Sequence, residues 1–132
     1  MLKRIDHIEF IVRNMDEFIV FFQKMGFRLL SKTEHQGGSV EMALPGPSQA
    51  IFEIHAVRGM ENPCISHIAF VTNDIEADTE ELKKKSFEFE SECHYVEATG
   101  RTISNFRNPD GFRFQLVDER KEEPIAGKYG KR

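Results

Sequence analysis

Two histidines occupy equivalent positions in two similar segments of this chain, sixty residues apart. The segment RIDHIEFIVRNMDEFIVFFQKMGF aligns without a gap with CISHIAFVTNDIEADTEELKKKSF, which pairs His7 with His67. Apolar matches alone would indicate only two strand–helix units that pack alike. A repeated histidine indicates chemistry as well, because imidazole is a common metal ligand. Two copies related by a pseudo-twofold axis would let His7 and His67 converge on one metal ion or ligand.

Side-chain alternation predicts further polar residues on the same face as these histidines. In a strand predicted at residues 5–12, Ile8 and Phe10 face one side, and His7 and Glu9 face the other. The same alternation applies to the strands that contain FEIH and RFQL. One face is therefore expected to carry His7, Glu9, Glu53, His55, His67, Arg113 and Gln115.

A solvated sheet face is the alternative explanation for this polar set. Two equivalent histidines with a carboxylate are typical of a metal site, whereas a wet face usually carries Thr, Lys, Arg and Glu. The residue types therefore favour metal coordination. Glu9 and Arg113 are expected to line the cavity or form ion pairs, and a structural role is expected for His35, His94 and Cys93.

Hydrophobic periodicity predicts one strand, one helix and three strands in each half of the chain. The predicted strands span residues 5–12, 27–34, 39–44, 50–57, 65–72, 87–95, 101–107 and 112–118. The first helix is expected to begin at Asn14 and to end at Gly26, and the second to begin at Asn73 or Asp74. Asn-Pro-Asp-Gly at 108–111 predicts a turn.

The first helix carries more apolar residues than one buried stripe requires. Its predicted core stripe consists of Met15, Phe18, Ile19, Phe22 and Met25. Val20 and Phe21 lie off this stripe, which predicts a partner surface and therefore a homodimer.

Composition excludes several classes of function. The net charge is only −4, and the 30% of residues that are charged form no long runs, which argues against nucleic-acid or anionic-membrane binding. Two cysteines make no disulfide framework, and the sequence shows neither a signal segment nor a membrane span. The cytoplasm is the expected location.

Three motifs appear in order along the chain: DHIEFIV with a helix ending in MGF, ISHIAFVTND with an acidic helix, and NFRNPDGFRFQLVD. Together they cover most of residues 4–118 and resemble the vicinal oxygen chelate superfamily, which includes glyoxalase I, methylmalonyl-CoA epimerase, extradiol dioxygenases and bleomycin-resistance proteins. The resemblance implies one α+β domain over residues 1–118, built of two tandem βαβββ modules at about 1–60 and 61–118. It also implies a curved, incompletely closed, eight-stranded barrel-like sheet around a polar cavity, followed by a polar tail at 119–132.

The resemblance implies one divalent metal ion, bound by a residue on the first and last strand of each module. Carried over by position, the ligands are His7, Glu53, His67 and Gln115. His55 remains the substitute for Glu53, because the gap-free offset pairs Gln115 with His55. Nickel, cobalt, zinc, manganese and iron all suit such a donor set. Gln115 departs from the family, which usually has a glutamate here, and a neutral amide cannot act as a general base.

The implied function is a glyoxalase I-like lyase or isomerase acting on a small α-oxygenated carbonyl compound such as a thiol adduct. The base would be Glu53, Glu9 or hydroxide on the metal. A metal-free or vestigial-site binding protein of the bleomycin-resistance type is the alternative. An extradiol dioxygenase is disfavoured, because the last-strand carboxylate that this chemistry uses is missing.

Overall fold

The structure is a computed structural model that describes residues 1–34 and 38–120, and the chain divides into two compact units. His7–Ser66 form the unit called here the first half. The first six residues group instead with the chain from His67 onward, and together they form the second half. His35 and residues 121–132 of the predicted tail lie outside the described residues.

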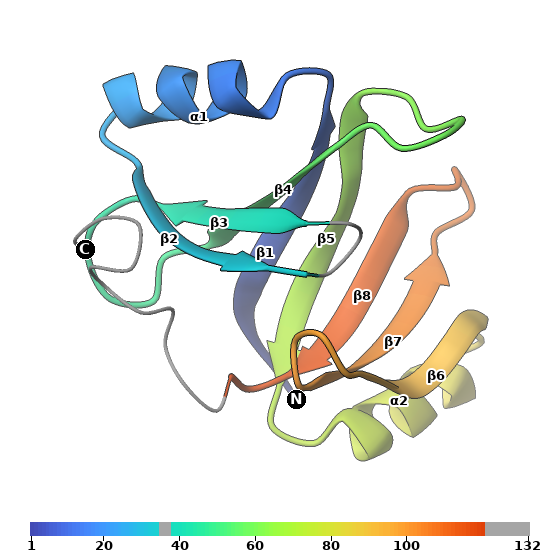
Figure 1. Cartoon of the computed structure of the whole chain (residues 1–132). Coiled ribbons are helices and arrows are strands. Elements are labelled where there is room, and N and C mark those ends of the chain that lie inside the picture. The colour runs from blue at the N-terminus through green and yellow to red at the C-terminus, as the bar shows by residue number, and fades with distance from the viewer. Residues whose placement is uncertain (35–37, 121–132) are drawn as a thin grey trace. The chain divides into compact units, whose positions relative to one another are not determined.

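The first half contains a mixed sheet covered on one face by a helix. Its elements are β1 (Leu2–Val12), α1 (Met15–Lys24), β2 (Arg28–Thr33), β3 (Ser39–Ala43) and β4 (Ile51–Ala56). The strands lie in the order β2-β3-β4-β1, with β1 parallel to β4 and the other pairs antiparallel. Helix α1 runs along one side of this sheet (Figure 1).

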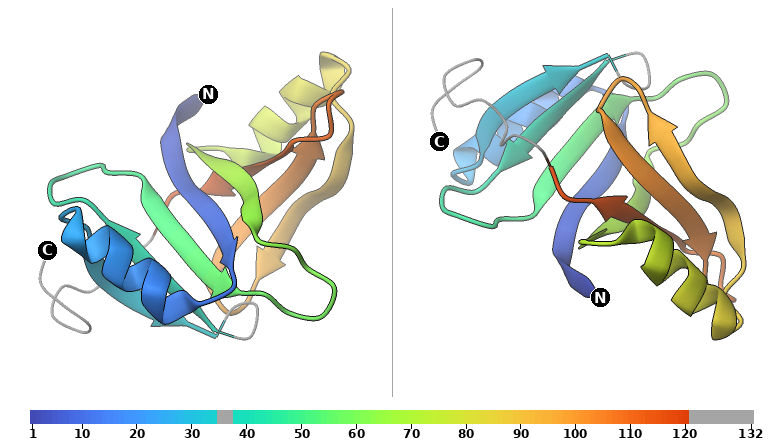
Figure 2. Two further views of the ribbon diagram at one scale, coloured as in Figure 1. Left: turned by 90° about the horizontal axis from the view of Figure 1, so that it is seen from above. Right: turned by 90° about the horizontal axis from the view of Figure 1, so that it is seen from below.

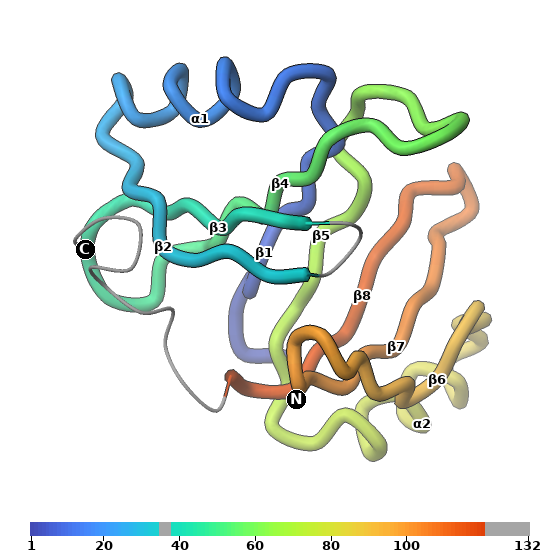
Figure 3. Tube along the Cα trace, viewed as in Figure 1, coloured from blue at the N-terminus to red at the C-terminus, as the bar shows by residue number. Residues whose placement is uncertain are grey.

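The second half repeats the same plan. Its elements are β5 (Cys64–Thr72), α2 (Ile75–Lys84), β6 (Phe89–Val96), β7 (Arg101–Arg107) and β8 (Arg113–Asp118). The strands lie in the order β5-β8-β7-β6, with β5 parallel to β8, and α2 packs against this sheet (Figure 2). Both halves therefore follow the same order of elements, which can be followed along the trace in Figure 3. The predicted α+β class and the repeated βαβββ plan are thus confirmed.

The ends of α1 follow the predicted signals. The side chain of Asn14 accepts a hydrogen bond from the backbone N–H of Glu17 at 3.0 Å, which caps the first turn. Gly26 adopts a φ of 102°, and the N–H of Phe27 bonds to the carbonyl of Phe22, so the helix ends in a Schellman motif. The prediction that Met25 belongs to the core stripe is wrong. This residue caps the helix end and is 59% exposed, because the chain turns away there.

The core of the first half lies between α1 and one face of its sheet. Val12, Val40, Met42 and Ile54 are buried there, and an aromatic cluster packs over them. The ring centroid of Phe10 lies 5.1 Å from that of Phe18 and 5.0 Å from that of Phe52. Because the apolar side chains of β1, β3 and β4 turn toward α1, the alternate residues of these strands point to the opposite face.

Helix α2 is anchored in the same way. Asp74, one of the two predicted starts, is its N-cap and accepts from the N–H of Ala77. Ile75 and Thr79 are buried, and Leu82 packs on the core of the second half. No helix among the described residues is long and apolar enough to cross a membrane.

A buried ion pair ties the start of β1 into the second half. The guanidinium of Arg101 donates to both carboxylate oxygens of Asp6, at 2.7 and 2.9 Å, and to the carbonyl of Asp118 at 2.6 Å. Both charged side chains are almost fully buried. The first residues of β1 are therefore held by β7 and β8 as well as by the chain that follows them.

Candidate functional site

A row of polar residues crosses the sheet of the first half on the face opposite α1. Glu9 of β1 lies opposite Glu53 of β4, Glu53 lies opposite Glu41 of β3, and Glu41 lies opposite Ser31 of β2. Residues in register on neighbouring strands point to the same face. We call Ser31, Glu41, Glu53 and Glu9 the first row.

The first row concentrates acidic groups in a region from which water is largely excluded. Glu9, Glu41 and Glu53 are all buried. The hydroxyl of Ser31 donates to Oε1 of Glu41, which fixes one end of the row. Burying carboxylates at neighbouring positions costs free energy, because they repel one another and lose their hydration.

His7 belongs to the same face as the first row. It precedes Glu9 by two residues on β1, where it lies in register with Ile51. The imidazole is buried. The first half thus offers one imidazole and a carboxylate row on a single face, as the alternation of β1 and β4 predicted.

The second half has a corresponding row with different chemistry. Ala69 of β5 lies opposite Gln115 of β8, Gln115 opposite Asn105 of β7, and Asn105 opposite Ser91 of β6. Nε2 of Gln115 donates to Oδ1 of Asn105 at 3.0 Å, and Nδ2 of Asn105 donates to the hydroxyl of Ser91 at 2.9 Å. We call Ser91, Asn105, Gln115 and Ala69 the second row.

The two rows identify which residues are equivalent in the two halves. The sixty-residue offset pairs Glu9 with Ala69, and these residues lie opposite Glu53 and Gln115 respectively. Glu53 is therefore the counterpart of Gln115. The gap-free offset pairs Gln115 with His55 instead, because the connections between the strands differ in length. Along the rows, Glu41 corresponds to Asn105 and Ser31 to Ser91.

His67 takes the place in the second half that His7 takes in the first. It precedes Ala69 by two residues on β5 and is buried. Arg113 precedes Gln115 by two residues on β8, and its Nε is buried without a hydrogen-bond partner among the described residues. The second half thus presents an imidazole, a neutral amide and a cation on one face.

His55 lies between two carboxylates of the first half. Its ring is fully buried, with Nδ1 3.7 Å from Oε2 of Glu9 and Nε2 3.3 Å from both carboxylate oxygens of Glu61. Glu61 comes from the connection after β4 and also accepts from the backbone N–H of Arg58 at 2.8 Å. That backbone bond is the main reason why the pKa of Glu61 is lowered. The contact with His55 adds to the shift against the opposing effect of desolvation.

These contacts separate His55 from Glu53, the two alternatives for one predicted ligand. Both ring nitrogens of His55 face carboxylates, which suits a residue that links β1 to the connection after β4. Glu53 occupies the centre of the first row instead. The arrangement therefore favours Glu53 as the residue equivalent to Gln115.

The donor set of each half can be compared with the needs of a divalent ion. Among the residues that the structure describes, no three or more His, Cys, Asp and Glu side chains form a group that could hold a metal ion. In the ligand set expected from the sequence, each half would supply one imidazole and one oxygen donor, His7 with Glu53 and His67 with Gln115. Imidazole, carboxylate and amide oxygen are all accepted ligands of first-row divalent metals, so these residue types fit.

The members of the rows that were not predicted from the sequence include Glu41 and Asn105. Glu41 stands between Val40 and Met42, which repeats the apolar-Glu-apolar pattern around Glu53 and could have marked it. Asn105 stands between Ser104 and Phe106 and carries no comparable signal. Its importance appears only through its bond to Gln115.

Cys93 and His94, two of the residues expected to be structural, are not members of either row. The thiol of Cys93 contacts the hydroxyls of Thr79 and Ser104 beside α2, at 3.9 and 3.8 Å. His94, which follows it on β6, is exposed.

Comparison with known proteins agrees with this repeated architecture. The family model of the Glyoxalase/Bleomycin resistance protein/Dioxygenase superfamily matches residues 4–116. The uncharacterized protein YwbC of Bacillus subtilis (strain 168) is 29% identical over 121 residues, which cover 84% of this chain and 94% of that protein.

Two solved epimerase structures share the fold. A variant of Streptomyces coelicolor methylmalonyl-CoA epimerase in complex with 2-nitronate-propionyl-CoA is 21% identical, with a TM-score of 0.74 over 90% of this chain and 99% of that chain. Methylmalonyl-CoA epimerase from Mycobacterium tuberculosis is 18% identical, with a TM-score of 0.76 over 89% and 88% of the two chains. The resemblance predicted from the three sequence motifs is thereby confirmed: this chain belongs to the glyoxalase/bleomycin resistance protein/dioxygenase superfamily.

Proposed function

We propose that this protein is a divalent-metal-dependent isomerase or lyase that moves a proton next to a carbonyl group of a small substrate. The first row carries this proposal, because a buried set of three carboxylates supplies both a metal ligand and a base on one face. A merely solvated sheet face would not bury Glu9, Glu41 and Glu53 side by side.

The proposed metal ligands are His7 and Glu53 from the first half and His67 and Gln115 from the second. Two imidazoles, one carboxylate and one amide oxygen suit nickel, cobalt, zinc, manganese or iron. A bound divalent ion would polarise a substrate carbonyl and so acidify the adjacent C–H bond. A side chain of this protein would then accept the proton.

The base is proposed to come from the neighbours of Glu53 in the first row. If Glu53 is a metal ligand, the substrate proton would pass to Glu9, to Glu41 or to hydroxide on the metal. Oε2 of Glu9 lies near the ring of His55, whereas Glu41 is held through one oxygen by Ser31. We therefore assign the base to Glu41, with Glu9 as the second candidate.

The proposed substrate is a small α-oxygenated carbonyl compound in a thiol adduct, as in glyoxalase I-like chemistry. An acyl thioester is the second candidate, because the similar epimerase structures contain 2-nitronate-propionyl-CoA or methylmalonyl-CoA. Both classes have an acidic C–H bond beside a polarised oxygen. Arg113, with its buried Nε, suits an anionic group on either substrate.

Proton exchange tests the reaction without requiring the natural substrate. Protein purified without chelator is loaded with each divalent metal and incubated in D₂O with a hemithioacetal or an acyl-CoA thioester. We expect NMR to detect metal-dependent loss of the α-proton signal, reduced at least about 100-fold in Glu41→Gln, since general bases contribute about 10²–10⁴-fold. Glu97→Gln, an exposed change, is the matched control. Absence of exchange with every metal and both substrates would contradict the proposal.

A metal-free binding protein is the second candidate function, because bleomycin-resistance proteins belong to the same superfamily. Elemental analysis of protein purified without chelator separates the two candidates. About one bound divalent ion per chain supports the enzyme. Metal-free protein whose melting temperature rises with a small ligand, but not with any divalent metal, supports the binding protein.

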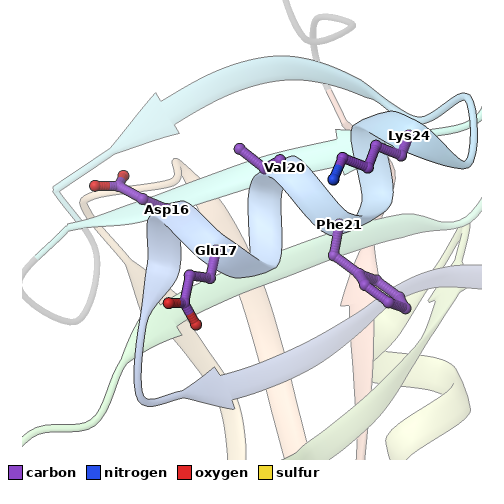
Figure 4. A pocket seen from close by; sticks show the side chains of 5 residues that line it. All are labelled: Asp16, Glu17, Val20, Phe21 and Lys24. Atoms are coloured by element: carbon purple, nitrogen blue, oxygen red, sulfur yellow. The ribbon is translucent and has the colours of Figure 1, made fainter.

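We also propose that the protein forms a homodimer through α1. Val20 and Phe21 remain 48% and 61% exposed on this helix, between Asp16 and Glu17 at one end and Lys24 at the other (Figure 4). Two copies of α1 packed antiparallel would bring opposite charges together at both ends of this apolar strip. The surface is therefore complementary to itself, as a twofold interface requires.

A further inference from the structure

We propose that Asn105 is a positioning residue that orients the amide of Gln115 so that its oxygen faces the bound metal ion. This inference rests on the proposed function, because it assumes that Gln115 is a metal ligand. It concerns a residue that carries no signal in the sequence, and it explains how a glutamine can replace the glutamate that is usual in the superfamily.

The orientation of the Gln115 amide follows from its hydrogen bond. Nε2 donates to Oδ1 of Asn105 at 3.0 Å, so the NH₂ end of the amide points along the second row toward β7. The amide oxygen is then the end left to bind a ligand. Both residues are buried, so water offers little alternative partner for a rotated amide.

Asn105 is also bonded on its other side, where its Nδ2 donates to the Ser91 hydroxyl at 2.9 Å. Each end of the Asn105 amide therefore has a hydrogen-bond partner, Gln115 on β8 and Ser91 on β6. The three side chains, each from a different strand, form one directional chain from β8 to β6. Such outer partners set the geometry of metal ligands, and their loss commonly weakens metal binding by about 10–100-fold.

Comparison with the first row shows why only Gln115, and not Glu53, needs a neighbour that orients it. Both ends of the Glu53 carboxylate are oxygens, so either can bind a metal and no neighbour has to select one. Its lateral neighbour is Glu41, and the Glu53 carboxylate has no N–H to donate to it. A glutamine has one coordinating end and one repelling end, and the residue corresponding to Glu41 is the amide Asn105.

The test measures metal affinity by calorimetry in Asn105→Leu, which removes the acceptor while roughly keeping the size of the side chain. We expect affinity to fall about 10–100-fold. Asn105→Asp keeps an acceptor for Nε2 and should bind metal at least as tightly as the unchanged protein. Ile103→Val is the control, because it alters packing on the same face of β7 without removing a side-chain hydrogen bond of the second row. Equal affinity in Asn105→Leu and the unchanged protein would overturn the proposal.

A double-mutant cycle separates orientation from general support of the fold. In a Gln115→Glu background both ends of the side chain coordinate, so adding Asn105→Leu should then cost less than about threefold. A loss as large as that in the Gln115 background would mean that Asn105 acts on stability alone and would overturn the proposal. Circular dichroism of each variant checks that it folds.

An observation of the amide itself distinguishes failure of this inference from failure of the proposed function. In ¹⁵N-labelled protein, the side-chain NH₂ signals of Gln115 are expected to show slow hydrogen exchange that is retained in Asn105→Asp and lost in Asn105→Leu. If neither the unchanged protein nor any variant binds metal, but the Gln115 signals show this pattern of exchange, the proposed orientation of Gln115 is supported and the proposed metal function is contradicted. If the signals exchange rapidly in the unchanged protein, the orientation itself is wrong.

Discussion

Gln115 sets the charge of the proposed metal site. Gln115→Glu adds a negative charge in a nearly isosteric side chain, and Asn105 can accommodate it by turning its NH₂ toward the new carboxylate and accepting from the Ser91 hydroxyl. Attraction between unit charges at ligand distance is worth several kcal/mol even at an effective dielectric of about 20, less the cost of desolvation. We expect at least about tenfold tighter metal binding by calorimetry, and faster turnover of a hemithioacetal.

Gln115→Ala provides the comparison for this prediction, because it should leave a three-ligand site that binds metal more weakly but detectably. Unchanged affinity in Gln115→Glu would mean that Gln115 is not a ligand. The site would then consist of His7, His67 and one of Glu53 or His55.

The paired histidines lead to a second prediction at the residue scale. His7→Ala or His67→Ala should lower metal affinity by at least the roughly 10–100-fold that loss of an outer partner causes. His94→Ala is the matched control, since that histidine is exposed on β6. Metal content measured by elemental analysis should fall in the first two variants only. Full metal content in His67→Ala would remove it from the site.

At the scale of elements, the connection after β4 depends on an ionised Glu61. Its folded-state pKa is lowered chiefly by the Arg58 N–H and further by His55 and the Arg58 charge, while desolvation opposes the shift. Its contribution to stability is therefore present above the unfolded-state pKa and lost as the pH falls through the folded-state pKa. Glu61→Gln should lower the urea midpoint at neutral pH, and the difference should vanish at strongly acidic pH.

Glu97→Gln serves as the control for this acid dependence, because it removes a carboxylate from an exposed position. An NMR titration of Glu61 gives the direct check. An apparent pKa at or above the ordinary glutamate value would contradict the prediction.

The attachment of β1 to the second half gives a prediction about stability. Asp6→Ala removes both hydrogen bonds between the buried Arg101 guanidinium and the Asp6 carboxylate, and breaking a buried ion pair in this way typically costs about 3–5 kcal/mol. Lys3 lies on β1 like Asp6 and forms an exposed ion pair with Glu119. Lys3→Ala removes this pair and should cost less than about 1 kcal/mol. Urea unfolding of the two variants measures both values. Equal losses would show that the buried pair is not what holds the start of β1.

At the scale of the whole molecule, the α1 surface predicts assembly. Sedimentation velocity at micromolar concentration should show a dimer, and Phe21→Glu should convert it to monomer. Lys24→Glu should weaken the dimer, and combining it with Asp16→Lys and Glu17→Lys should restore it, because antiparallel packing pairs these ends. Met60→Glu, a change at a nearly fully exposed residue outside α1, is the control. A strictly monomeric unchanged protein would contradict the prediction.

The order of the helices and strands and the residues of the polar face could be predicted from the sequence, because both depend on local patterns. The capping signals at Asn14 and Asp74 and the turn at Gly26 placed the helix ends. Alternation in β1 and β4 placed Glu9 and Glu53 away from α1, since a period of two fixes the side to which each residue points. Met25 was misplaced, because a periodic stripe does not show where the packed part of a helix stops.

The rows themselves were decided only by tertiary structure. Register between strands far apart in sequence depends on connection lengths and on irregularities such as those between Leu29 and Ser31, and between Ser91 and His94. A gap-free comparison carries no information on either, so it paired Gln115 with His55 and overlooked Asn105. The sequence determined which residue types face away from the helices. Strand pairing determined which of them touch, because hydrogen-bonded register is a property of the folded sheet and not of any one strand.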